Sequence, residues 1–197
     1  FCNKNLFDFE NVDLSDLDSI NNFLNNLSIN SSILGMVHCA SAPLEIGPIQ
    51  SPFNTTQEIN NYILNVISFR MIASFIVNNS STPTRNICIL SEAISGTPPI
   101  GFKSYCSHKN ALLSLVKQFA IETASLGHRF NSISPGMIDN NYSSSVSRLT
   151  VKYQEASNPS KRLANSQDIA EASINLLLSK SSFINAQNIF VNGGSKI

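Results

Sequence analysis

The fold is decided by residues 86–138, NICILSEAISGTPPIGFKSYCSHKNALLSLVKQFAIETASLGHRFNSISPGMI. This stretch begins with a short apolar run, crosses a loop rich in Gly and Pro, and enters a long run with apolar residues at helical spacing. A second short apolar run then ends at Pro135 and Gly136. Short apolar runs between turn signals are typical of strands buried on both faces. The stretch therefore predicts a strand, a helix and a second strand of one parallel sheet.

The same alternation continues on both sides of this stretch. Strands are predicted at residues 7–14, 32–40, 85–91, 128–136 and 187–194. Helices are predicted at 15–27, with Ser15 as the N-terminal cap, and at 55–79, 105–126 and 166–180. The polar, Ser-rich residues 137–160 are predicted to form a mobile loop with some helix. Alternating strands and helices without repeats or a linker predict an α/β doubly wound parallel sheet, in a single domain over residues 1–197.

Composition and charge narrow the class of partner. Lys plus Arg and Asp plus Glu number 13 each, so the formal net charge is zero, and the chain has no basic block. This balance argues against nucleic acid as the main partner. No apolar run approaches the roughly 18 residues that span a bilayer, and no signal-peptide pattern is present. We therefore expect neither nucleic acid nor a membrane as a partner.

The cysteines are Cys2, Cys39, Cys88 and Cys106, and their spacing matches neither CxxC nor a metal-ligand pattern. Cys39 and Cys88 lie in or beside apolar runs and are predicted to be small core residues. This usage predicts no metal site and a reducing, cytoplasmic compartment.

The first chemical candidate is the pair Tyr105 and Lys109, which share one helix face at i and i+4. A phenol has a pKa near 10, and a nearby ammonium lowers that pKa by favouring the phenolate. Ser91 ends the preceding predicted strand and could hydrogen-bond a substrate oxygen. Proton transfer with oxygen polarisation suits carbonyl reduction or alcohol oxidation when a hydride carrier lies opposite. Taken alone, YxxxK is common, and the same pair could simply share a helix face.

Six motifs in the expected order make the chain resemble the short-chain dehydrogenase/reductase family over residues 7–194. Within residues 86–138 lie a serine strand, a YxxxK helix and a following N-x-[IV]-x-PG strand. The others are VDLSD at 12–16, NVISF at 65–69 and QNIFVNGG at 187–194. The resemblance implies a Rossmann-like fold and a compact enzyme that uses NAD or NADP to interconvert a carbonyl and an alcohol.

The resemblance also implies a catalytic tetrad of Asn65, Ser91, Tyr105 and Lys109. Tyr105 would be the general acid/base, and Lys109 would assist it while binding the nicotinamide ribose. Ser91 would polarise the carbonyl, and Asn65 would hold a water of the proton relay.

Cofactor-binding residues follow from the same comparison of motifs. Asp13 would hold the adenine ring, and Ala40 would keep the close approach to cofactor that the family's NNAG motif provides. Pro135, Gly136 and the backbone at Ile138 would line the nicotinamide. Tyr105 and Lys109 would contact the cofactor as well, and Asn140 would bind the carboxamide in place of a threonine.

Several positions depart from the family pattern. The NNAG motif reads HCAS at 38–41, so Ser41 replaces a glycine at a position that the resemblance implies binds cofactor, and His38 is expected to have a core or strand-end role. Ser91 lies 14 residues before Tyr105, one more than usual, and Ser95 in the following loop is its rival. Glu92 is expected to be a solvated loop residue, and no role is assigned to His108.

The largest departure is an absent motif, because no glycine-rich GxxxGxG or GxGxxG turn occurs in the chain. Such a turn binds the pyrophosphate through backbone amides and a helix N-terminus. We expect the chain to lack its first βαβ unit, roughly 30 residues or more, and to bind dinucleotide poorly by itself. The residue that would select NAD or NADP falls in the same absent unit.

The sequence thus favours an NAD(P)-dependent oxidoreductase that acts on a small-molecule substrate. The resemblance also implies a homodimer or homotetramer built on helices 55–79 and 105–126. Residues 143–159 are expected to cover the site and to suit a polar substrate, such as a sugar or acyl-carrier derivative. The main alternative is a non-catalytic, regulatory relative. An epimerase/dehydratase is disfavoured because only about 50 residues separate Pro135 from Gln187, within one compact domain. A serine hydrolase is weaker, because the GxSxG elbow is missing.

Overall fold

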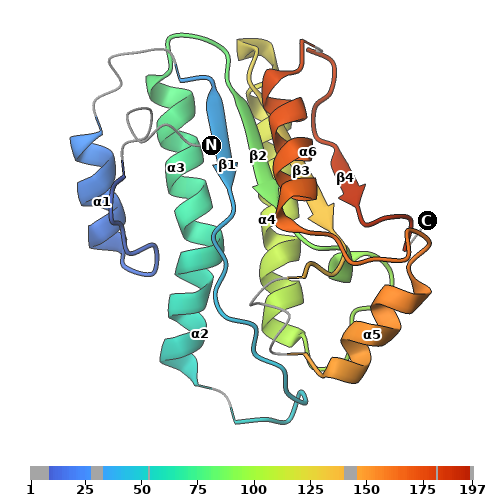
Figure 1. Ribbon diagram of the computed structural model, residues 1–197. Coiled ribbons are helices and arrows are strands. Elements are labelled where there is room, and N and C mark those ends of the chain that lie inside the picture. The colour runs from blue at the N-terminus through green and yellow to red at the C-terminus, as the bar shows by residue number, and fades with distance from the viewer. Residues whose placement is uncertain (1–8, 28–32, 53, 140–145, 181, 196–197) are drawn as a thin grey trace.

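The computed structural model describes residues 9–27, 33–52, 54–139, 146–180 and 182–195. Within these residues the chain forms a parallel sheet in the order β1-β2-β3-β4. The strands are β1 (Gly35–His38), β2 (Arg85–Ile89), β3 (Arg129–Pro135) and β4 (Asn188–Val191). All four point the same way, so their carboxyl ends lie at one end of the molecule (Figure 1).

Helices cover both faces of this sheet (Figure 1). They are α1 (Leu17–Asn26), α2 (Thr55–Tyr62), η2 (Ile63–Ile67), α3 (Ser68–Asn79), η3 (Glu92–Ile94), α4 (Lys103–Glu122), η4 (Ala124–Leu126), α5 (Arg148–Ser157) and α6 (Ser166–Leu178). The core places α3 and α4 on one face and α6 on the other. The predicted doubly wound α/β architecture is confirmed.

The second half of strand β2, Ile87 to Ile89, is apolar without interruption because helices cover both faces of the strand. Cys88 belongs to the cluster that α3 and α4 form over one face, whereas Ile87 and Ile89 pack with Ile133 and Ile169 on the face of α6. Successive side chains of a strand point to opposite faces, so a strand covered on both faces needs apolar residues at every position. Each fully buried Ile or Leu contributes roughly 1.5–3 kcal/mol to folding.

The predicted helix over 55–79 is one continuous helical path that contains a π-helical turn. The α-helical hydrogen bonding of α2 gives way to η2 and then returns in α3. A π turn inserts an extra residue into the helix and is frequent at functional sites. Here it contains Asn65.

The same segment, Thr55–Asn79, has 25 residues and contains an 18-residue window with a mean hydropathy of 1.2, so it is long and apolar enough for a membrane span. This differs from the expectation that no apolar run approaches that length. In the fold, Phe69 and Ala73 of this segment are completely buried in the core cluster of the sheet. A core helix covering a sheet accounts for this apolar composition.

The predicted strand at residues 7–14 is wrong over its described part, because residues 9–13 have no regular structure and 14–15 form a turn. Asp13 accepts hydrogen bonds from the Ser15 backbone at 2.8 Å and from the Ser15 hydroxyl at 2.6 Å. A strand needs a hydrogen-bonded neighbour, and no strand among the described residues pairs with this segment. The cap of α1 is also Asp16 rather than Ser15, since the Asp16 carboxylate accepts from the Asp18 backbone.

Candidate active site

Tyr105 and Lys109 lie in the first two turns of α4, beside the carboxyl end of β2. The Lys109 side chain is only 3% exposed, and its Nζ donates to the Ile89 backbone oxygen at 2.9 Å. Nζ also lies 5.8 Å from the centre of the Tyr105 ring. Phe102 packs edge-on against the same ring, with centroids 6.0 Å apart. The structure therefore brings the predicted pair together at the edge of the sheet where parallel α/β proteins bind ligands.

The ammonium of Lys109 has unused hydrogen-bonding capacity. An ammonium has three N–H donors, and among the described residues only the Ile89 oxygen accepts from it. Burial lowers the pKa of Lys109 from its ordinary value. A buried cation with spare donors fits the hydroxyl groups of a ribose, so this position suits the nicotinamide-ribose end of a dinucleotide.

Asn65 is buried in the π turn and has a partner for each polar atom of its side chain. Its Nδ2 donates to the Asn61 backbone oxygen at 2.7 Å and lies 3.4 Å from His108 Nδ1. Its Oδ1 accepts from the Ala42 backbone amide at 3.3 Å. The Asn65 side chain therefore joins η2, the segment after β1, and α4.

A small cavity of about 20 Å³ lies beside this amide. Its lining includes Asn65, Tyr105, His108, Ser41 and Ala42. Two predicted catalytic residues and one predicted cofactor-binding residue thus share one cavity. Ala40, another predicted cofactor contact, lies half-buried one residue before Ser41.

Ser91 follows β2 directly and begins the short helix η3. Its Oγ accepts from the Ala93 backbone amide at 3.2 Å, which caps η3. Ser95, the rival position, ends the same turn. The two serines are therefore separated by η3, and Ser91 is the one fixed to the end of the strand. Ser91 does not line the cavity beside Asn65.

The end of β3 is close-packed against the end of β4. Pro135 is buried, and the Gly136 amide donates to the Val191 oxygen at 3.1 Å. A Cβ at Gly136 would lie 3.1 Å from Asn192 Cβ, closer than most real contacts, so glycine allows this approach. Ile138 continues the path through a parallel bridge to Ala164.

Asp13 and Asn140 are the two predicted cofactor contacts that remain. Asp13 is exposed in the turn before α1, and its hydrogen bonds from Ser15 hold its pKa below the usual range. Asn140 lies outside the described residues. In the described part of the chain, no three His, Cys, Asp or Glu side chains gather as metal ligands.

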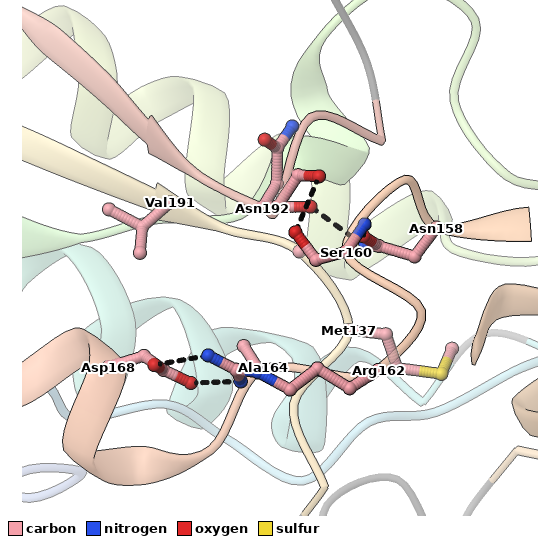
Figure 2. Close-up of a pocket in the computed structure, with 10 residues that line it drawn as sticks. Met137, Asn158, Ser160, Arg162, Ala164, Asp168, Val191 and Asn192 are labelled. Carbon is pink, nitrogen blue, oxygen red and sulfur yellow. Dashed lines mark hydrogen bonds and ion pairs between the residues drawn. The ribbon is translucent and has the colours of Figure 1, made fainter.

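A larger cavity of about 170 Å³ lies at the ends of β3 and β4 (Figure 2), and among its lining residues only Gly136 was predicted to belong to a site. Arg162 closes one side through two hydrogen bonds to the Asp168 carboxylate, at 2.7 and 2.8 Å. Asn158 donates to the Asn192 oxygen at 2.9 Å on the other side. The capping signal at Asn165 and Asp168 marked the start of α6, but nothing in the sequence showed that β4 would meet it here.

Of four residues with a predicted environment, two differ from the expectation and two agree with it. Glu92 was wrongly expected to be solvated, since its Oε2 accepts from Asn192 Nδ2 at 3.1 Å and Ser195 Oγ at 2.6 Å. Cys88 is buried as predicted, whereas Cys39 is exposed. The expected core role of His38 is observed, because its buried Nε2 donates to the Asn65 backbone oxygen at 3.3 Å.

The fold and site together define a Rossmann-like α/β protein with a Tyr-Lys pair at the carboxyl edge of its sheet. A family model described as Enoyl-(Acyl carrier protein) reductase matches residues 6–196. A short-chain type dehydrogenase/reductase from Mycobacterium ulcerans superposes with a TM-score of 0.82 at 26% identity, covering 94% of this chain and 69% of that one. This chain belongs to the short-chain dehydrogenase/reductase family.

Curated relatives carry the name 3-oxoacyl-acyl-carrier-protein reductase FabG. The protein from Buchnera aphidicola is 29% identical over 126 residues, which cover 64% of this chain and 52% of the relative. The protein from Rickettsia conorii is 28% identical over 197 residues, which cover 97% of this chain and 78% of the relative. The chain thus spans about half the length of the first of these relatives.

Proposed function

We propose that this protein is an NAD(P)-dependent oxidoreductase that interconverts a carbonyl and an alcohol, with Tyr105 as the general acid/base. The observation that carries the proposal is the buried Lys109 ammonium, 5.8 Å from the Tyr105 ring. Burying an unpaired cation costs free energy, and packing alone does not require one here. A cation at this position stabilises negative charge on the phenolic oxygen, which is what proton transfer by a tyrosine needs.

Each remaining site residue has a task in this proposal. Ser91, held at the end of β2 by the Ala93 amide, donates a hydrogen bond to the substrate oxygen and so polarises the carbonyl. Asn65 fixes the segment after β1 through the Ala42 amide and so shapes the wall beside Tyr105. A bound nicotinamide cofactor supplies or accepts the hydride.

The residues present fit the nicotinamide end of such a cofactor. Lys109 offers donors to the ribose, and the close-packed turn at Pro135 and Gly136 provides a wall at the strand end. Ala40 and Ser41 flank the same edge of the sheet from β1. The pyrophosphate has no glycine-rich turn within these 197 residues.

The substrate class follows from the relatives, which are named for reduction of 3-oxoacyl groups on acyl carrier protein. We propose a 3-oxoacyl thioester for this protein as well. Leu149 and Tyr153 of α5 are exposed and belong to residues 143–159, which are expected to cover the site, so they offer apolar surface for an acyl chain.

Two measurements test the proposal, each on the 197-residue chain and on the product of the complete reading frame. NADH and NADPH binding is followed by fluorescence titration, and turnover is followed by NAD(P)H absorbance with acetoacetyl-coenzyme A. Tyr105→Phe should keep dinucleotide binding and lose about 10²- to 10⁴-fold in turnover, the usual contribution of a general acid/base. Ser107→Ala, which removes an exposed hydroxyl from the same helix, is the control.

Absence of binding and turnover in both forms would overturn the enzyme proposal and favour a regulatory relative.

We further propose a cytoplasmic protein that forms a homodimer or homotetramer through α2, α3 and α4. Exposed apolar side chains on these helices and on η4, such as Ile59, Ile121 and Leu126, support that assembly.

A further inference from the structure

His108 lies between Tyr105 and Lys109 in the sequence, yet its side chain faces a different set of partners. It is 5% exposed. Its Nε2 lies 3.3 Å from Glu58 Oε1 on α2, and its Nδ1 lies 3.4 Å from Asn65 Nδ2 in η2. The Tyr62 ring packs edge-on against the imidazole, with centroids 5.5 Å apart. The ring is thus held on three sides by residues of the α2–η2 segment.

The partners determine where the imidazole proton lies. An amide NH₂ can only donate, so His108 Nδ1 accepts from Asn65 and carries no proton. A neutral imidazole then has its proton on Nε2, where it donates to the Glu58 carboxylate. Burial lowers the pKa of His108 and favours this neutral form, although the Glu58 carboxylate acts in the opposite direction.

The same bonds determine how the Asn65 amide is turned. Both of its N–H groups are used, one on the Asn61 oxygen and one on His108. This leaves Oδ1 facing the Ala42 amide. If the amide were reversed, its NH₂ group would face the Ala42 N–H, and two donors would face each other without an acceptor. The acceptor at His108 Nδ1 therefore reinforces the orientation that the Asn61 oxygen and the Ala42 amide also favour.

We propose that His108, held by Glu58, is a positioning residue that fixes Asn65 and, through it, the cavity wall beside Tyr105. The positioning follows from the contacts alone, whereas its effect on turnover rests on the proposed function.

Protonation of His108 would weaken this arrangement. Nδ1 would then carry a proton directed at Asn65 Nδ2, so that bond is lost and the two like donors repel, which leaves the amide held by the Asn61 oxygen and the Ala42 amide alone. The charged and titratable groups around the ring and its cavity are Glu58 and Tyr62 of α2, Lys109 and Tyr105 of α4, and Glu45 of the loop after β1. The Glu58 carboxylate favours the protonated ring, whereas the nearby Lys109 ammonium disfavours it.

The proton position is tested by long-range ¹H–¹⁵N NMR of the histidine rings, which distinguishes the two neutral tautomers. We expect the Nε2–H tautomer for His108 at neutral pH. We also expect a lower His108 pKa in Glu58→Gln, which keeps an acceptor and removes the charge. The proposal would be overturned by an Nδ1–H tautomer, or by a His108 pKa that is the same in Glu58→Gln as in the parent protein.

The effect on Asn65 is tested by hydrogen exchange of the Ala42 amide in two matched variants. In His108→Asn the side-chain oxygen takes the place of Nδ1, whereas His108→Gln keeps a polar atom near Nε2 and lacks the Nδ1 acceptor. We expect exchange to accelerate about five- to tenfold in His108→Gln, as for one lost hydrogen bond, and to stay near the parent rate in His108→Asn. Equal rates in the two variants would contradict the proposal. If either variant fails to fold, as judged by circular dichroism, the NMR result on Glu58→Gln decides.

Turnover provides the link to function. The parent protein should lose NAD(P)H-dependent turnover on the acid side as His108 protonates, and His108→Asn should lack that limb of the pH profile. An acid limb that is identical in the two would overturn the link. A parent protein without turnover at any pH refutes the proposed function instead, and the NMR and exchange data still decide the positioning role.

Discussion

His38 at the end of β1 donates from Nε2 to the backbone oxygen of Asn65 in the π turn, over 3.3 Å. The His38 ring also packs edge-on against Phe69, with centroids 5.3 Å apart. One imidazole therefore ties the edge strand of the described sheet to the helix that carries Asn65. Burial, with the Lys109 ammonium as a second cause, lowers the pKa of His38 to about 4, so this ring is neutral at pH 7.

Stability should accordingly fall as the pH is lowered from about 6.5 to 4. The unfolded chain takes up a proton at His38 near its ordinary pKa, whereas the folded chain does not until about pH 4. The stabilisation is complete above pH 6.5, and the loss by pH 4 is on the order of 3 kcal/mol at most. Urea unfolding at several pH values measures it. His38→Gln keeps a donor and cannot titrate, so a pH slope equal to that of the parent would contradict the assignment.

Lys109→Met should abolish the proposed chemistry while the fold remains. The methionine fills a similar buried volume but supplies neither charge nor donors, so we expect turnover to fall at least about 10²-fold. Dinucleotide affinity should also weaken, because the spare Lys109 donors are proposed to bind the ribose. Lys117→Met, an exposed change on the same helix, is the control for loss of charge. Unchanged turnover in Lys109→Met would rule out the proposed role of the ammonium.

Phe69→Ala should be strongly destabilising. Phe69 is completely buried, and its ring contacts both His38 and Phe119 edge-on. Truncation leaves a cavity between α3 and the sheet and should lower the free energy of unfolding by roughly 3–5 kcal/mol. Denaturant unfolding checks the value against Phe75→Ala on the same helix, where the side chain is only partly buried. A cost below that of Phe75→Ala would mean that the core near His38 is packed differently.

Asp168→Asn should lower the melting temperature at pH 7 and leave it unchanged near pH 2. Asp168 binds Arg162 through both oxygens and accepts the Asn165 amide in the capping box of α6. These contacts, the Arg162 hydrogen bonds first, lower the pKa of Asp168 to about 2, so its stabilisation is lost as the pH falls from about 4 to 2.

We expect a shift of about 2–5 °C at neutral pH, as for loss of one cap. Glu171→Gln on the same helix is the matched control, since Glu171 has no ion pair among the described residues. An equal shift in both variants would show that helix charge, rather than the cap, determines the effect.

The sequence by itself determined the order of the elements and the Tyr-Lys pair. Strand and helix periods are local properties, so β2, α4 and β3 could be located from residues 86–138 with bounds close to those observed. The spacing of Tyr105 and Lys109 fixed their common helix face in the same local way. The one strand predicted wrongly, at 7–14, fails because a strand depends on a neighbour that its own residues do not specify.

Only the tertiary structure decided which side chains meet across the sheet and between helices. His108 meets Asn65 across 43 positions of the chain, and Glu92 meets Ser195 across 103. Neither contact leaves a periodic pattern in the sequence, because each depends on how two distant segments pack. The contact of His108 also depends on the π turn that orients Asn65. From sequence alone, a polar residue in a loop or helix is expected to face solvent. The partners of Glu92 and His108 lie far away in the sequence, so only the folded chain shows them.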